Sequence, residues 1–222
     1  MNFDFTYMVE LIPVLLKYLP IVLYMAIFAF ILAVILGLIF SSIIRNKVKI
    51  IYPILLVVIS YFRGTPSLVQ IFIFYFGAPQ LIPAMSAMDA VTAVIIALSL
   101  RNAAYLSEVF RSAFAAVDKG QAEAALSVGM TRWQTFRRIV LPQAIKIAIP
   151  PTGNFFIMMF KETSLAFTIG VTDMLAQAKL EAAVSYRFLE AFLAVGLIYW
   201  AVTALFTYIQ SKIEWKIEKP YR

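Results

Sequence analysis

Histidine and cysteine are both missing from these 222 residues, and charged residues make up only 14% of the chain. The sequence therefore offers no disulfide, cysteine-ligated metal site, thiol nucleophile or imidazole base, which excludes many enzyme classes. It also has no G-x-x-x-x-G-K-[ST] loop to hold nucleotide phosphates. We expect no metal, no cofactor and no catalytic residue in this chain.

Apolar side chains are abundant instead. Hydrophobic residues make up 63% of the sequence, and the mean hydropathy is +0.88. Soluble domains are typically about 45–50% apolar and about 25% charged, so the composition predicts a single all-α membrane domain over 1–222. The net charge of +7 does not indicate a nucleic-acid partner, because the basic residues lie between the apolar runs.

Five apolar runs are long enough to cross the roughly 30 Å hydrocarbon core, which takes about 20 residues. The second run is interrupted by Arg63-Gly64-Thr65-Pro66. No basic region of a cleaved signal peptide precedes the first run, so we expect that span to stay. The expected spans are 18–44, 50–76, 90–114, 149–171 and 190–210.

The fourth span has two alternative starts, because the apolar run 139–171 is too long for one ordinary crossing. We place its start near Ile149, since Pro142 and the pair Pro150-Pro151 are expected to break a straight helix, and proline suits the first turn of a new one. The segment 161–164 then lies inside the membrane. The alternative span starts at the beginning of the run.

Basic residues indicate the orientation of these spans. The segment 45–49 has three positive charges and no acid, whereas the loop 77–89 has no positive charge. The segment 111–146 and the C-terminal tail are basic again. The positive-inside rule predicts an N-terminus outside and a C-terminus in the cytoplasm.

A polar helix is predicted within the cytoplasmic segment 119–144. At 3.6 residues per turn, a small apolar patch separates from the charged side chains, and Gly120 and Gly129 permit turns at either end. This helix either docks onto another protein or rests on lipid headgroups. The patch consists of Ala122, Ala125, Leu126 and Val128–Gly129.

Here the sequence resembles a known family. "GQAEAALSVGM" followed by "RIVLPQA" resembles the EAA signature of permease subunits in binding-protein-dependent ABC importers. The stretches 61–77, 103–125 and 161–170 are similar to corresponding parts of the polar amino-acid (histidine, glutamine and arginine) branch. Four motifs in the same order cover nearly the whole chain.

The resemblance implies a type I ABC importer permease fold with five spans and a short cytoplasmic coupling helix. That helix would dock on a separate ATP-binding subunit, which holds ATP and Mg²⁺. An extracytoplasmic amino-acid-binding protein would deliver substrate, and a second permease subunit, identical or related, would complete the path. The implied coupling residues are Glu123, Ala124, Ala125, Gly129, Met130 and Arg132.

Polar residues inside the expected spans are candidates for the substrate path, because ionisable groups are expensive there. Arg101, Tyr105 and Glu108 share one helical stripe. Two interpretations are open. In the first, Arg63 or Arg101 pairs with Glu108, and the pair only fixes the packing of the helices. In the second, these groups bind the charged ends of an amino acid. The candidates are Arg63, Asn102, Tyr105, Glu108, Glu162, Thr163 and Ser164.

A structural role is the favoured interpretation for Arg63, because the interrupted helix beside it leaves carbonyls that need donors. For Glu108 and Glu162 both interpretations stay open. Two acids on the path would favour basic amino acids, unless an arginine neutralises either one.

The sequence thus predicts the permease subunit of an ATP-driven importer for polar amino acids, basic ones among them, in a bacterial or archaeal plasma membrane. An ion-gradient-driven amino-acid transporter is the first alternative, although we find no inverted repeat of the kind common in such proteins. A membrane scaffold that transports nothing is the second. Besides its protein partners, the chain should contact lipid and an amino-acid substrate.

Overall fold

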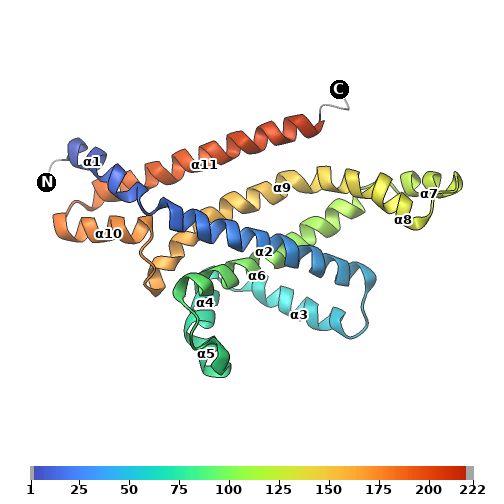
Figure 1. Cartoon of the computed structure of the whole chain (residues 1–222), viewed down its shortest axis with the longest axis horizontal. Helices are drawn as coiled ribbons and strands as arrows, with labels where there is room; N and C mark the ends of the chain where they lie inside the picture. Colours follow the sequence, from blue (N-terminus) through green and yellow to red (C-terminus); the bar gives the residue numbers. More distant parts are fainter. Residues whose placement is uncertain (1–2, 219–222) are drawn as a thin grey trace.

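The computed structural model describes residues 3–218, and every regular element in that range is helical (Figure 1). Several long helices run along the long axis of the molecule, and shorter ones gather at its two ends. In chain order the elements are α1 (Phe5–Leu16), α2 (Leu19–Asn46), α3 (Ile51–Gly64), α4 (Ser67–Phe72), the π-helix η1 (Ile73–Gly77), α5 (Ala78–Leu81), the 3₁₀-helix η2 (Pro83–Met85), α6 (Ala90–Ala115), α7 (Lys119–Ser127), α8 (Arg132–Thr135), the π-helix η3 (Phe136–Val140), α9 (Leu141–Glu162), the 3₁₀-helix η4 (Thr163–Ile169), α10 (Met174–Ser185) and α11 (Phe188–Glu218).

Three of these helices are by themselves long and apolar enough to cross a membrane, namely α2, α6 and α11. Two further crossings are possible if each of two bent helix pairs forms one span. The first pair, Ile51–Gly64 and Ser67–Leu81, is bent by 114°, and the second, Arg132–Ile169 and Met174–Ser185, by 52°. This agrees with an all-helical membrane protein of three to five spans.

The most extensive helix contact joins α2 to α6. Ala29, Ala33 and Gly37 repeat every four residues on α2 and are buried. A Cβ atom added to Gly37 would lie only 3.0 Å from the Leu106 Cβ and 3.4 Å from the Ala103 carbonyl oxygen. Small residues let two helices approach closely in a membrane, where the packing itself must hold them together. We call this contact the α2–α6 seam.

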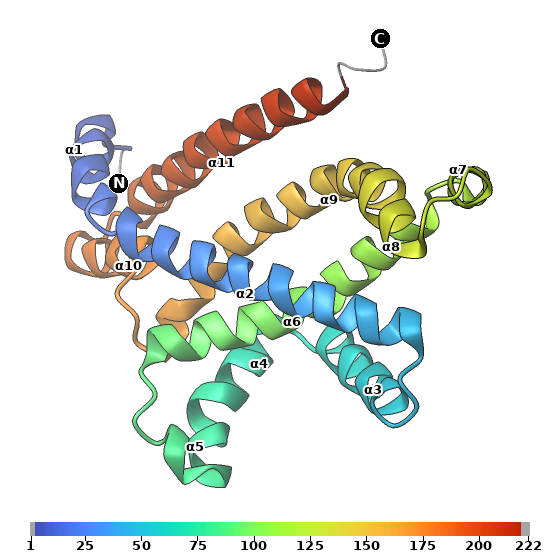
Figure 2. The same cartoon turned by 45° about the vertical axis from the view of Figure 1, so that its right-hand side comes forward.

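The expected interruption of the second apolar run is present, and it is sharp. Thr65 has an extended backbone (φ −109°, ψ 146°), and Pro66 follows it before α4 begins. The buried Gln70 amide Nε2 lies 2.9 Å from the Phe62 carbonyl oxygen and 3.1 Å from that of Thr65. We expected Arg63 to supply these donors. Gln70 does so instead, because it lies on α4 just past the bend. Figure 2 shows α4 and α5 projecting from the side of the bundle.

The prediction that a new helix begins near Ile149 is wrong. Helix α9 starts at Leu141 and continues through Pro150 and Pro151 to Glu162. Proline in the second position of α9 suits its first turn. The internal prolines are tolerated because neighbouring groups in a membrane protein can satisfy a disturbed backbone. Gln210 of α11 also donates to the Pro150 carbonyl at 3.0 Å and so joins α9 to α11 at the prolines.

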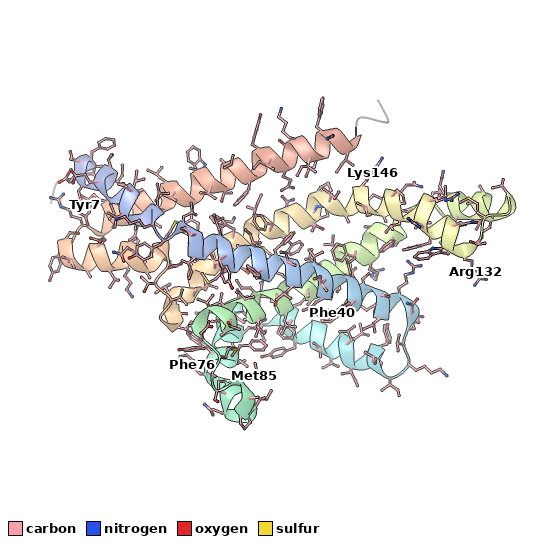
Figure 3. All side chains as sticks on the ribbon, in the orientation of Figure 1. Tyr7, Phe40, Phe76, Met85, Arg132 and Lys146 are labelled. Atoms are coloured by element: carbon pink, nitrogen blue, oxygen red, sulfur yellow. The ribbon has the colours of Figure 1, made fainter. Side chains whose placement is uncertain are left out.

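Helices α1 and α10 were not predicted, and they pack at the end of the molecule opposite to α7 and α8. The Arg187 guanidinium lies 2.7 Å from the Asp4 carboxylate. The hydroxyl groups of Tyr7 and Ser185 share a hydrogen bond of 2.9 Å. These contacts fasten the start of the chain to the region between α10 and α11, where Figure 3 labels Tyr7.

Replacing Gly37 by leucine should destabilise the protein, because the side chain would force the α2–α6 seam apart. Overpacking of this kind typically costs about 1–3 kcal/mol, and each kcal/mol lowers the midpoint of thermal unfolding by about 2–4 °C in a protein of this size. The matched control is Gly196→Leu on α11, where an added Cβ meets open space. Equal midpoints for the two variants in detergent would refute the seam.

Candidate functional site

Tyr105 lies at the centre of the polar residues in the middle of the bundle. The Arg63 guanidinium carbon is 5.4 Å from the centre of its ring, and that of Arg101 is 5.2 Å away. The Tyr105 hydroxyl donates to the Arg63 carbonyl oxygen at 3.0 Å. Arg63 and Tyr105, which are 42 residues apart in the sequence, are thus held together where α3 ends beside α6.

Arg101 forms an ion pair with Glu162 across the gap between α6 and the end of α9. The distance from the Arg101 guanidinium to the Glu162 carboxylate is 3.2 Å, and the two side chains are only 16% and 18% exposed. One of the two interpretations left open by the sequence paired Arg63 or Arg101 with Glu108, and the structure forms neither ion pair within the described residues. Glu162 is nearer to Arg101 because η4 begins directly after it and turns the chain back toward α6.

Glu108 is paired within its own helix. The Arg111 Nε donates to the Glu108 carboxylate at 2.9 Å, and a second guanidinium nitrogen contacts the other oxygen. The two residues are three positions apart, so they lie on the same face of α6. Both side chains are exposed, so Glu108 faces the surroundings together with its counter-charge.

A cavity of about 880 Å³ opens beside these residues, between the ends of α2, α3, α6 and α7. Arg63, Glu108 and Arg111 contribute to its lining, while Arg101 and Glu162 lie outside it. Its other charged lining residues are Arg45, Lys47, Asp118 and Lys119. The cavity therefore brings together two of the predicted path residues, Arg63 and Glu108.

The remaining predicted path residues donate to backbone carbonyls three or four positions earlier in the chain. Asn102 is fully buried and donates to the Leu98 carbonyl oxygen at 2.8 Å. Thr163, also fully buried, donates to the Phe160 carbonyl at 2.8 Å. Ser164 donates to the Lys161 carbonyl at the same distance. None of these three side chains lines the cavity.

The EAA segment forms two short helices joined by a tight turn. The Asp118 carboxylate accepts from the Gly120 amide at 2.6 Å and so caps the start of α7. Thr131 and Gln134 form a reciprocal capping box at α8. Between the helices, Gly129 has φ +85°, in the left-handed region that favours glycine. The turn expected at Gly129 is confirmed, whereas Gly120 lies inside α7.

The predicted apolar patch on this segment is only partly correct. Ala125 is buried, because its side of α7 packs toward the chain itself, and Met130 is half-buried. The exposed side chains are those of Leu126 and Val128, together with Trp133 on α8. The remaining predicted coupling residues, Glu123, Ala124, Gly129 and Arg132, are exposed as well. Figure 3 shows Arg132 at this end of the molecule.

A stack of side chains, which sequence reasoning missed, joins this segment to the long helices. The Arg45 guanidinium at the end of α2 lies 5.5 Å from the ring centres of both Phe114 and Phe136. Phe114 and Phe136 are stacked at 6.0 Å, and Trp133 stacks on Phe136 at 5.8 Å. We call these four residues the Arg45 cluster. It connects the ends of α2 and α6 to α8 and η3. The only sequence feature that pointed to this contact was the basic segment 45–49.

Comparison with known proteins gives one consistent result. Residues 32–219 match the family described as "Binding-protein-dependent transport system inner membrane component". The probable amino-acid permease protein YxeN of Bacillus subtilis (strain 168) is 52% identical over 99% of this chain and 98% of its own length. The probable amino-acid ABC transporter permease protein PatM of Vibrio harveyi is 48% identical over 100% of this chain and 99% of its own.

Solved structures agree with this result. A chain of a crystal structure described as an amino acid ABC transporter with histidines superimposes with a TM-score of 0.88. It is 35% identical, and the match covers 97% of this chain and 100% of that chain.

Replacing Arg45 by glutamine should loosen α8 and η3. Each exposed cation–π contact contributes about 0.5–1 kcal/mol, so losing two should raise the amide exchange of residues 131–140 about 5- to 30-fold. Hydrogen exchange followed by mass spectrometry measures this directly. Lys49→Gln removes a charge from the same loop, outside the cluster, and should leave exchange unchanged. Equal exchange in both variants would show that the Arg45 cluster does not hold the segment.

Proposed function

Because the chain belongs to the inner-membrane components of binding-protein-dependent transport systems, as the permease subunit of an ABC importer for polar amino acids, we propose that the cavity beside Arg63 is part of its substrate path and that α7 docks on the ATPase subunit. The chain is not itself an enzyme. Such a system includes an ATPase, which binds the ATP, and a binding protein. It operates in a bacterial inner membrane, and the family favours ATP over an ion gradient as its energy source.

Several basic segments gather at one end of the molecule, which we propose faces the cytoplasm. The end of α2, the helices α7 and α8 and the end of α11 lie toward this end, and α1 lies at the other (Figure 1). Arg132 and Lys146 are labelled at the same end in Figure 3. Under the positive-inside rule, this arrangement supports an N-terminus outside and a C-terminus inside.

The observation that carries the docking proposal is the exposure of apolar residues on a polar, well-capped segment. Leu126, Val128 and Trp133 are 46%, 79% and 67% exposed. Aromatic and apolar side chains at the centre of a protein interface contribute most of its binding energy. The Arg45 cluster attaches this surface to the ends of α2 and α6, so a displacement of α7 would be passed to the spans. This supports docking over resting on lipid headgroups.

A second permease subunit, identical or related, would complete the path. The bent second span leaves large apolar side chains exposed on the surface of this chain. They include Ile54, Val57, Phe72, Ile73 and Phe76. Another subunit could cover part of this surface and lipid the rest. Alternating access would then open the path to the binding protein on one side and to the cytoplasm on the other.

The substitution Val128→Glu tests the docking surface. A buried carboxylate at the interface should weaken association of the ATPase subunit by at least about 2 kcal/mol, roughly 30-fold. We expect loss of the ATPase subunit on co-purification and loss of ATP-dependent uptake in proteoliposomes, with normal membrane insertion. Val48→Glu, an exposed valine on the neighbouring basic loop, is the matched control. Full uptake and co-purification with Val128→Glu would disprove docking at this surface.

A further inference from the structure

An apolar groove lies between α2, α6 and α9, next to the cavity beside Arg63. Its volume is about 250 Å³, and nine of the ten residues that line it are apolar. Leu38 of α2 and Ile145 of α9 are 45% and 47% exposed, so the groove is open to the surroundings. We propose that it holds one acyl chain of an anionic phospholipid, whose phosphate is bound by Arg45 and Arg137.

The walls of the groove suit a hydrocarbon chain. Leu141, Ile145 and Ile149 are spaced four residues apart on α9 and form one wall as a continuous row. Phe114 of α6 and Leu38 of α2 contribute to the other walls. The stretch of α9 that lines the groove rises about 16 Å, which is about half of the roughly 30 Å hydrocarbon core. An acyl chain that enters from one headgroup layer can therefore lie along it.

An apolar groove alone would not select one lipid over another. Lipid tails are as apolar as its walls, so a chain that leaves the bilayer for the groove gains little hydrophobic energy. The headgroup is the part that differs among the lipids. Charged residues at the mouth of the groove must therefore decide which lipid binds there.

Two arginines continue the rows of residues that line the groove. Arg137 lies four residues before Leu141, one helical turn from the start of the α9 wall. Arg45 lies seven residues after Leu38, which is close to two turns on the same face of α2. The Arg45 guanidinium is also 5.5 Å from the ring centre of Phe114, a lining residue. Both arginines thus lie at the end of the groove that is nearest to α8.

Both arginines are available to a phosphate group. Their side chains are exposed, and within residues 3–218 neither has a carboxylate within ion-pair distance. Guanidinium groups bind phosphate oxygens through paired hydrogen bonds. Basic pockets between helices on the cytoplasmic side of a membrane bind anionic headgroups. Phosphatidylcholine carries a phosphate as well, but its choline cation offsets that charge, so the arginines favour a lipid with net negative charge.

The lipid site is separate from the proposed substrate path and from the docking surface. Among the described residues, Phe114 alone lines both the groove and the cavity. Leu126, Val128 and Trp133, which are exposed on the docking surface, do not line the groove. A lipid bound here would pack where η3 joins α9, and would leave the cavity and the docking surface open.

The experiment uses the complete complex of permease, ATPase and binding protein in nanodiscs of equal parts phosphatidylglycerol and phosphatidylcholine. One sample contains phosphatidylglycerol with a photoactivatable diazirine in an acyl chain, and the other contains phosphatidylcholine labelled in the same way. After illumination, mass spectrometry measures the labelling of 110–114 and 141–152 relative to that of α11, whose exposed apolar side chains report bulk lipid.

We expect phosphatidylglycerol to label the groove at least about tenfold more than phosphatidylcholine, because each basic residue near the headgroup contributes about a factor of five. Equal labelling by the two lipids would overturn the proposal, since the groove would then hold any chain. Labelling of α11 without labelling of the groove would also overturn it, because another protein chain would then cover the groove.

Ile145→Trp tests the groove itself. The larger side chain should block the mouth and reduce labelling by phosphatidylglycerol about tenfold, while labelling of α11 is unchanged and shows that the variant is folded. Ile147→Trp is the matched control, because Ile147 is an exposed isoleucine of the same helix that does not line the groove. Full labelling of the groove in Ile145→Trp would refute the site.

Arg137→Gln tests the phosphate contact. The ratio of phosphatidylglycerol to phosphatidylcholine labelling should fall about fivefold, because one positive charge is lost. Lys49→Gln is the control, since Lys49 is exposed on the basic loop but lines neither the groove nor the cavity. A ratio that is the same in Arg137→Gln, Lys49→Gln and the unchanged protein would contradict the assignment of the phosphate.

Discussion

The close packing of α2 on α6 is the constraint on which the rest of the structure depends. Because Gly37 has no side chain, the backbone of α2 at this position packs closely against the Leu106 side chain of α6. Helix α6 carries several of the predicted path residues in its middle and Phe114 near its C-terminal end. Any change in the separation of α2 and α6 would therefore move both the middle of α6 and Phe114. The Arg45 cluster also joins α2 to α6, because Arg45 lies in the last turn of α2 and contacts Phe114 of α6.

Charge placement follows from the membrane environment. An isolated ionic group within the bilayer is costly, so such groups are paired or face a water-filled cavity. Arg101 and Glu162 satisfy the first condition, and Glu108 with Arg111 satisfies both. Arg63 satisfies only the second, because it faces the cavity without a carboxylate partner in the described part of the chain.

Local signals in the sequence predicted the helical class and several long helices, but they missed α1 and α10 and did not predict the contacts of the site. Hydropathy located α2, α6 and α11 closely, and Thr65-Pro66 marked the bend correctly, because both depend on short segments. The prolines of α9 led to a wrong prediction, because packing against α2, α6 and α11 can hold a helix that its own residues disfavour. The pair of Arg101 and Glu162 joins residues 61 positions apart. Such a pairing depends on how η4 turns, which residue types alone do not reveal.

The central claim is that the α2–α6 seam and the Arg45 cluster hold α2, α6, α8 and η3 together as one rigid unit. Because the chain has no cysteine, spin labels can be placed at Asn46→Cys at the end of α2 and at Arg138→Cys on η3, both exposed positions. Labelled chains diluted with unlabelled ones in the complete complex report the distance within one chain by pulsed electron paramagnetic resonance. The account predicts the same distance distribution with and without ATP. A shift of several ångströms on ATP binding would contradict it.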